Sequence, residues 1–343
     1  MVDGQELVLK DFGILWFHPR NRRDLAVMYK SFFGLKENPF NVSPDPRYIF
    51  LTREIEEALS SLMYGIQTRK GILTLTGEVG TGKTTLINRL LDWLARERIK
   101  SAFLFNSRMN SSQLFDFVLA EFEISCDSKS KSHQLMKLNQ WLMERFRAGE
   151  TAVLIIDEAQ NLTFPVLEEI RLLTNLETST QKLLQIVLSG QPELDEKLKL
   201  PQLRQLRQRI TIRAKTTPLN RDQTHAYIYE RLRIAGAETN GEPIFSASAI
   251  DSVHVYSLGV PRVINLLCEH SLINAFAENQ RTVPASIPEE VAREFQLDQV
   301  EPIASPESLR TSAELFNSEA FIQNLGEALS RFRLPSSPAR DRK

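Results

Sequence analysis

The chain has 343 residues, and a typical size of about 150 residues per domain predicts two compact units. Hydrophobic residues make up 42% and charged residues 25% of the chain, so it can bury a core and global disorder is excluded. Lysine and arginine number 42 against 43 aspartate and glutamate, a net charge of −1. This balance removes any whole-chain argument for nucleic-acid binding and leaves only a local basic stripe to consider.

The cysteine content and the lack of long apolar runs in the sequence both bear on the cellular compartment in which the protein is expected. Cys126 and Cys268 are too few for a disulfide framework, so we expect small buried side chains in a reduced compartment. The longest apolar stretches are far shorter than the roughly 18 residues of a membrane helix, and the acidic N-terminus does not fit a signal peptide. A cytoplasmic protein is therefore predicted.

Strand and helix patterns alternate along the first two thirds of the chain. Residues 1–27 differ from the denser pattern that begins at Met28, so we expect either a translation start at Met28 or a loose N-terminal arm. Apolar residues at helical spacing predict helices over Thr52–Lys70, Thr84–Arg98, Leu114–Ile124, His133–Ala148 and Val166–Thr178. Short apolar runs predict strands over Gly71–Thr76, Ser101–Asn106, Ala152–Ile156, Leu183–Leu188 and Ile210–Ala214. Such strands between helices predict a five-stranded parallel sheet covered on both faces, an α/β fold within residues 28–218.

After Pro218 the pattern changes to helices alone. They are expected over Arg221–Ala235, Ser246–Ser257, Pro261–Asn279 and Glu289–Leu297, which predicts a small all-α domain over residues 219–299. Residues 300–343 are rich in serine and proline and are predicted to form a flexible tail, with a candidate amphipathic helix over Leu309–Phe332.

A phosphate-binding loop is the strongest motif. Gly77–Thr84 reads Gly-Glu-Val-Gly-Thr-Gly-Lys-Thr, follows a predicted strand and opens a predicted helix, which is the context that this motif requires. Its glycines let backbone N–H groups face an anion, and the helix N-terminus adds a positive dipole end. We expect Lys83 to reach the β- and γ-phosphates and Thr84 to bind Mg²⁺. The predicted nucleotide-binding residues here are Gly77, Glu78, Val79, Gly80, Thr81, Gly82, Lys83, Thr84 and Thr85.

Two acids end the third predicted strand, Asp157 and Glu158. At the carboxyl edge of a parallel sheet, Asp157 would lie beside the metal and Glu158 beside the γ-phosphate. Asp157 is therefore predicted to hold Mg²⁺, and Glu158 to activate the attacking water as general base. The strand Ser101–Asn106 between the two motifs favours the P-loop class with an inserted strand over a kinase or GTPase layout. No guanine-specificity motif is present, so ATP is the expected nucleotide.

Polar residues after the next strand could sense the γ-phosphate. Ser189 and Gln191 compete for this role, and either could instead cap the helix that begins at Pro192. Arg262, in Gly259-Val-Pro-Arg, begins a helix of the α-only domain, from which its guanidinium would face the nucleotide.

A basic run without acids could supply a cation to a neighbouring subunit. It contains Arg204, Arg207, Arg209, Arg213 and Lys215. A solvated basic face explains most of them, but one arginine could stabilise charge on the neighbour's γ-phosphate. Arg209, just before the fifth strand, is the predicted finger, with Arg207 and Arg204 as alternatives.

Together these elements resemble the AAA+ ATPases, and more narrowly the ExeA/GspA family (general secretion pathway protein A) associated with type II secretion. The resemblance covers about residues 28–300. It lies in the segments 28–35, 38–40, 44–46, 64–66, 75–85, 156–161, 190–194, 203–209 and 259–268. It implies Walker A at Gly77–Thr84, Walker B at Val153–Glu158, sensor 1 at Ser189–Gln191 and sensor 2 at Arg262. It also implies a helical lid after the sheet and an adenine border near Pro39–Leu51.

The resemblance leads to two functional hypotheses. The first is an ATPase that self-associates as a ring or filament and remodels a protein partner in secretion, envelope or exopolysaccharide assembly, at the inner membrane through that partner. The second is a DNA-binding ATPase like the transposition regulators, which the neutral charge and the lack of a DNA-reading module disfavour. A nucleotide-gated scaffold with slow turnover is a weaker third, because Glu158 is present. Family members usually continue into a membrane span and a peptidoglycan-binding domain, neither of which this sequence contains, so peptidoglycan remodelling is not expected.

Overall fold

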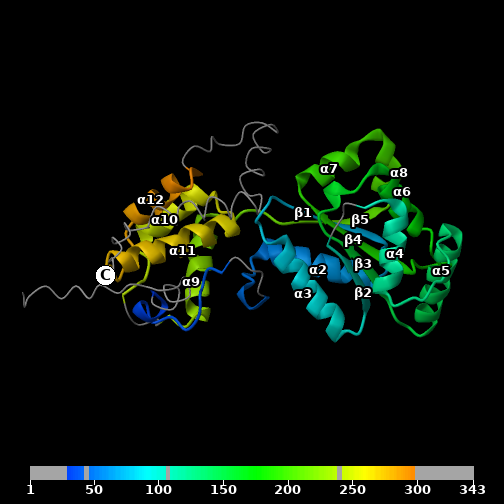
Figure 1. Ribbon diagram of the computed structural model, residues 1–343, viewed down its shortest axis with the longest axis horizontal. Coiled ribbons are helices and arrows are strands. Elements are labelled where there is room, and N and C mark those ends of the chain that lie inside the picture. The colour runs from blue at the N-terminus through cyan, green and yellow to red at the C-terminus, as the bar shows by residue number, and fades with distance from the viewer. Residues whose placement is uncertain (1–28, 42–45, 106–108, 238–241, 298–343) are drawn as a thin grey trace, which may run out of the picture.

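The computed structural model describes residues 29–41, 46–105, 109–237 and 242–297. Within these ranges the chain forms a sheet domain and a bundle of helices beside it (Figure 1). The predicted N-terminal arm, the predicted start at Met28 and the predicted tail with its amphipathic helix lie outside the described residues. Among the described helices, none combines the length and apolar character that crossing a bilayer requires.

Five parallel strands form the sheet, in the order β2-β3-β4-β1-β5. They are β1 (Ile72–Thr76), β2 (Lys100–Leu104), β3 (Ala152–Ile156), β4 (Leu184–Gly190) and β5 (Ile210–Lys215). The predicted five-stranded α/β fold is confirmed. The phosphate-binding loop follows β1 and the Asp157–Glu158 pair follows β3. Along the chain β2 lies between these two strands, whereas in the sheet β4 lies between them. Because all strands run the same way, the residues that follow β1, β3 and β4 meet at one edge.

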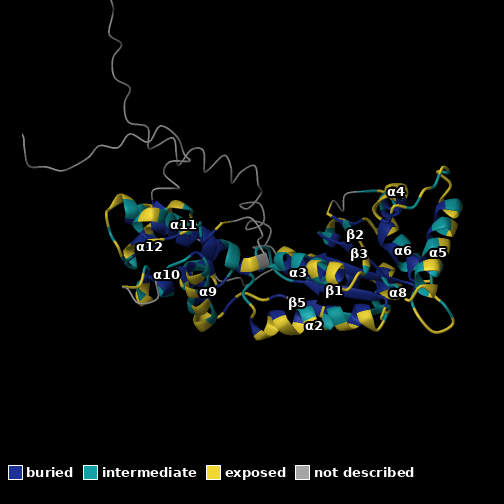
Figure 2. Ribbon diagram, turned by 90° about the horizontal axis from the view of Figure 1, so that it is seen from below, coloured by how far each residue is buried: buried dark blue, intermediate teal, exposed yellow. Residues whose placement is uncertain are grey.

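Helices cover both faces of the sheet, as unbroken apolar strands require. α2 (Arg53–Gln67) and α3 (Lys83–Arg96) pack on one face, toward which Val153 and Ile155 of β3 point. The other face carries α4 (Ser111–Glu121), α5 (Lys131–Arg147), α6 (Phe164–Leu173), α7 (Pro192–Lys199) and α8 (Arg204–Arg207). Figure 2 shows the buried strands between helices whose outer sides are exposed.

The helix predicted over Val166–Thr178 is shorter than expected. α6 begins at Phe164 and ends at Leu173, because the next residues form a tight turn. In this turn Thr178 N donates to Gln181 O at 2.9 Å, and Glu177 pairs with Lys182 in an antiparallel bridge. This hairpin-like connection leads directly into β4.

The helical unit is built from two distant parts of the chain. Its helices are α9 (Arg221–Ile234), α10 (Ala247–Ser257), α11 (Pro261–Ala277) and α12 (Ser286–Glu294). The sequence grouped the segment 29–40 with the sheet domain, but its buried side chains pack in the core of the helical unit. Phe40 contacts Phe245 edge to face with ring centroids 6.1 Å apart, and Tyr29 Oη donates to Glu269 Oε1 at 2.9 Å.

The chain passes between the two units twice among the described residues. After the segment 29–40, residues 46–52 lead through the short helix η1 (Pro46–Tyr48) to α2 of the sheet domain. Residues 216–220 lead from β5 back to α9. At the second passage Leu219 N donates to Gly259 O at 2.8 Å, which ties it to the turn before α11.

Replacing Phe40 by alanine is expected to destabilise the helical unit by about 3–5 kcal/mol, the usual cost of removing a fully buried aromatic side chain. Phe40 is 0% exposed, although it lies far along the chain from the helices that it contacts. Urea unfolding followed by circular dichroism measures the change. Phe105→Ala is the matched control, because Phe105 is 70% exposed. Equal unfolding midpoints for the two variants would contradict this account of the core.

Candidate nucleotide site

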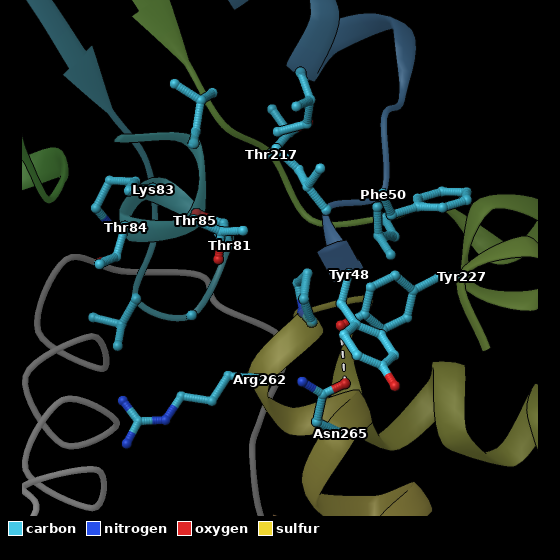
Figure 3. Close-up of a pocket in the computed structure, with 18 of the residues that line it drawn as sticks. Tyr48, Phe50, Thr81, Lys83, Thr84, Thr85, Thr217, Tyr227, Arg262 and Asn265 are labelled. Carbon is cyan, nitrogen blue, oxygen red and sulfur yellow. Dashed lines mark hydrogen bonds between the residues drawn. The ribbon is translucent and has the colours of Figure 1, made fainter. Parts of the chain in front are cut away.

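A cavity of about 380 Å³ lies between the phosphate-binding loop and the helical unit, within the usual size range of small-molecule sites (Figure 3). Residues of both units line it. They are Asn41, Tyr48, Ile49, Phe50, Ile55, Val79–Leu86, Glu158, Gln191, Thr217, Leu219, Tyr227, Arg231, Pro261, Arg262 and Asn265. Both passages of the chain between the units contribute to this lining.

The phosphate-binding loop turns from β1 directly into α3. Gly82 precedes α3 with φ 96°, in the left-handed region where a side chain is strained, so glycine is needed at this turn. The first N–H groups of α3 have no partners within the helix and form a site for an anion. The loop is held from its far side, where Thr81 Oγ1 is 2.7 Å from Thr216 Oγ1 at the end of β5.

Lys83 points back into this loop. Its Nζ donates to Gly77 O at 2.7 Å and to Glu78 O at 2.9 Å, and the residue is 7% exposed. Burial lowers the pKa of the Lys83 ammonium, while the nearby carboxylates Glu158 and Asp157 act in the opposite direction. The charge is thus held at the loop where phosphate groups would bind.

Asp157 ends β3 in a buried position. Its Oδ1 accepts hydrogen bonds from Ser189 Oγ at 2.7 Å and from Glu158 N at 3.0 Å. Burial raises the pKa of Asp157, and these two donors lower it. The carboxylate is therefore oriented by its neighbours before any ligand binds.

Glu158 follows with a left-handed backbone, φ 52°. Its Oε2 accepts from Gln160 Nε2 and, at 3.2 Å, from Gln191 Nε2. Glu158 and Gln191 both line the cavity. The two acids at the end of β3 thus differ in their surroundings, since Asp157 is buried outside the cavity lining and Glu158 lines the cavity.

The structure separates the two sensor candidates. Ser189 is 0% exposed, lies outside the cavity lining and contacts Asp157, so its placement is that of a positioning group and not of a nucleotide ligand. Gln191 is at the cavity wall. Of the loop residues, Val79–Thr85 line the cavity, whereas Gly77 and Glu78 lie outside the lining, where their carbonyls bind Lys83.

Thr84 and Asp157 offer the hard oxygen donors that Mg²⁺ prefers. Among the described residues no group of three or more His, Cys, Asp or Glu side chains could enclose a metal ion. One hydroxyl and one carboxylate fit Mg²⁺, which keeps several waters and binds proteins through one or two side chains together with substrate phosphates.

Arg209 lies at the opposite edge of the sheet from the cavity, because it precedes β5 whereas the phosphate-binding loop follows β1. Its Nη1 donates to Asn175 Oδ1 at 2.6 Å and also to Thr174 Oγ1, at the end of α6. Arg209 therefore does not join the site of its own chain, and its action on a neighbouring subunit stays a prediction. Arg204 and Arg207 lie on α8, and Arg213 and Lys215 on β5.

Arg262 links the helical unit to the phosphate-binding loop. It occupies the first turn of α11, and its backbone N–H donates to Gly80 O at 3.2 Å. The side chain lines the cavity and extends on the same side as Thr84 (Figure 3). An arginine placed here is suited to bind an anionic ligand at the loop.

The other end of the cavity holds residues that sequence reasoning missed. The Arg231 guanidinium lies over the rings of Tyr48 and Tyr227, at 4.9 and 5.0 Å from their centroids. Tyr227 Oη donates to Asn265 Oδ1 at 2.9 Å (Figure 3). The family resemblance pointed to Pro39–Leu51, which includes Tyr48. No local pattern indicated Tyr227, Arg231 or Asn265, since they come from two helices whose mutual orientation depends on packing.

Known proteins support the fold and the relationship. Residues 66–198 match the family model of the AAA domain. The chain is 44% identical over 257 residues to general secretion pathway protein A of Aeromonas hydrophila, a match that covers 75% of this chain and 46% of that protein. The chain thus spans about half the length of this curated relative.

Solved structures share the fold at low sequence identity. The origin recognition complex of Drosophila bound to DNA has a TM-score of 0.56 at 15% identity, over 98% of this chain and 85% of that one. Cdc6p from Pyrobaculum aerophilum has a TM-score of 0.54 at 15% identity, over 76% and 73% of the two chains. The chain therefore has the AAA+ P-loop fold with an AAA domain over residues 66–198, and it is related over three quarters of its length to general secretion pathway protein A.

Proposed function

We propose that this chain binds ATP with Mg²⁺ and hydrolyses it to ADP and phosphate. The observation that carries the proposal is the meeting of the phosphate-binding loop, Lys83 and Glu158 around one cavity. A triphosphate at this loop would meet the N–H groups of α3 and the Lys83 ammonium, which would leave its carbonyl partners for phosphate oxygens.

Each side chain at the sheet edge has a distinct role in this proposal. Glu158 takes a proton from water while the water oxygen bonds to the γ-phosphorus; the bond from that phosphorus to the β–γ bridging oxygen breaks, and its electron pair leaves with ADP. Gln191 and Arg262 bind oxygens of the transferred group. When bound, Mg²⁺ neutralises charge on the phosphate oxygens, and Thr84 and Asp157 are the residues that would hold it.

A calorimetric titration with ATP and Mg²⁺, followed by a phosphate-release assay, tests the proposal. We expect saturable binding at one site per chain and steady release of phosphate. Absence of binding by the folded wild-type protein would overturn both parts. Binding followed by release of one phosphate per chain, without turnover, would support the nucleotide-gated scaffold instead.

The site is proposed to be completed between subunits, with Arg209 of one chain acting on nucleotide bound to the next. Its position at the sheet edge away from its own cavity supports this, because Arg209 does not reach nucleotide bound in the cavity of its own chain. Self-association as a ring or filament would then make hydrolysis depend on protein concentration.

Mixing Arg209→Ala with Glu158→Gln protein is expected to restore part of the activity that each variant lacks alone. Hybrid interfaces would pair an intact Arg209 with an intact Glu158. Arg213→Ala is the matched control, since Arg213 is an exposed arginine of the adjoining β5. Phosphate release is measured across mixing ratios. Failure to recover activity at every ratio would argue against Arg209 acting between subunits.

The proposed cellular role is the nucleotide-driven remodelling of a protein partner in secretion or envelope assembly, at the inner membrane through that partner. The name of the Aeromonas hydrophila relative supports the secretion setting. Because the cavity is lined by both units, nucleotide binding and release would change how they meet, which is the motion that a remodelling ATPase transmits.

A further inference from the structure

The geometry points to Gln160 as the positioning residue for Glu158, an inference that rests on the proposed ATP hydrolysis. Gln160 follows the Asp157–Glu158 pair in the short helix η2 (Ala159–Asn161) and lies outside the cavity lining. Since its side chain does not line the cavity, its proposed effect on hydrolysis passes through the side chains that it contacts.

The Gln160 side chain bridges two strands of the sheet. Its Nε2 donates to Glu158 Oε2, and its Oε1 accepts from Gln191 N at 3.1 Å. The first bond holds the proposed general base after β3, and the second holds the residue that follows β4. Because both ends of the amide are engaged, its orientation is fixed, and so is the side of Glu158 that it holds.

The turn that carries Gln160 is itself fixed from α7. Lys197 Nζ donates to Gln160 O at 2.6 Å and to Leu162 O at 2.7 Å. Burial lowers the pKa of Lys197, whose ammonium lies under the turn. The backbone of Gln160 is thus anchored independently of its side chain, so that truncating the side chain leaves the turn in place.

A close approach in β4 supports the same assignment independently. A Cβ atom added to Gly190 would lie 2.7 Å from Gln160 Oε1 and 3.0 Å from Leu194 Cδ2. The absence of a side chain at Gly190 therefore leaves room for the Gln160 amide to pack against the backbone of β4. An alanine here would displace the Gln160 amide, which is the far end of a flexible side chain, and would also press on buried Leu194, whose Cβ lies 3.2 Å from the added atom.

As the proposed general base, Glu158 must direct its carboxylate at the attacking water, so the orientation of its side chain matters. Its left-handed backbone sets the direction in which that side chain leaves the chain. In the structure Glu158 lines the cavity while Gln160 holds its Oε2, so the bond keeps the carboxylate directed at the ligand. Without it Oε2 keeps the longer bond from Gln191 Nε2, at 3.2 Å, which positions the carboxylate less tightly, and a displacement of about 1 Å costs as much as 10²-fold in rate.

Gln160→Ala is expected to lower kcat for ATP hydrolysis by about 10- to 100-fold and to leave KM within about twofold. Calorimetric affinity for ATP and Mg²⁺ should also stay within about twofold, because Gln160 does not line the cavity. Gly190→Ala should reproduce the loss in kcat, and combining it with Gln160→Ala should add nothing, since both act on one amide.

Gln140→Ala provides the matched control. Gln140 Nε2 also donates to a glutamate, Glu144 Oε1 at 3.2 Å, but on the exposed side of α5. Its removal should leave kcat, KM and affinity at wild-type values.

The decisive comparison is made in the Glu158→Gln background, by single-turnover measurement of the residual rate. If Gln160 acts through Glu158, adding Gln160→Ala lowers this rate no further. An additive loss, a kcat equal to or above wild type in Gln160→Ala, or a weakened affinity that accounts for the loss would each overturn the assignment. A wild-type protein that does not hydrolyse ATP would instead overturn the proposed function, and this inference with it.

Discussion

Glu158→Gln is expected to lower kcat for ATP hydrolysis by about 10²- to 10⁴-fold, the usual contribution of a general base. The change keeps the length of the side chain and removes its ability to take a proton. Gln160 Nε2 and Gln191 Nε2 both donate to Glu158 Oε2, so the neutral amide keeps these two bonds only where its single oxygen takes that position. Phosphate release at saturating ATP measures the effect.

Nucleotide affinity separates this effect from a loss of binding. Calorimetric titration should find the affinity of Glu158→Gln for ATP equal to that of wild type or tighter, because a carboxylate that repels the γ-phosphate has been neutralised. Glu121→Gln is a matched control, since Glu121 is an exposed acid at the end of α4 and lies outside the cavity lining. Near-wild-type turnover in Glu158→Gln would remove Glu158 from the mechanism.

Lys83→Ala is expected to weaken ATP binding by about 10- to 100-fold, since hydrogen bonds to charged groups contribute about 1.5–3 kcal/mol. The loss should be larger for ATP than for AMP, because the ammonium lies at the loop and not at the tyrosine-lined end of the cavity. Isothermal titration with both nucleotides measures the difference.

An exposed lysine on α7 provides the control for the Lys83→Ala variant. Lys199→Ala removes an exposed ammonium that pairs with Glu196 at 2.7 Å on α7, and it should bind both nucleotides as wild type does. Thermal unfolding of Lys83→Ala without nucleotide verifies that the loop remains folded, since Gly77 O and Glu78 O lose their donor. Equal weakening for ATP and AMP would contradict a phosphate-binding role.

Local sequence patterns predicted the parts of this molecule that depend on near neighbours in the chain. The Gly77–Thr84 motif predicted the turn from β1 into α3, since the residue types of the loop determine its backbone shape. Apolar runs predicted all five strands to within a few residues, and β1, β3 and β4, which are buried on both faces, give nearly unbroken apolar runs.

Packing between distant segments could not be predicted in this way. Ser189 and Gln191 were equal candidates because a strand pattern does not say which residue is the last inside the sheet. β4 extends to Gly190, so Ser189 is buried against Asp157 and Gln191 faces the cavity. The segment 29–40 joins the helical unit through aromatic contacts such as Phe40 with Phe245, which no spacing within either segment reveals.

The two passages of the chain between the units constrain how the helical unit can move. A single linker would let the helical unit rotate about any axis. The two linkers among the described residues, at 46–52 and 216–220, instead favour rotation about the line that joins them. Both linkers border the cavity, through Tyr48 to Phe50 and through Thr217 and Leu219. A bound nucleotide would therefore lie next to the hinge axis of the helical unit. A small change in the volume or charge of the nucleotide would then produce a large displacement of the helices farthest from that axis.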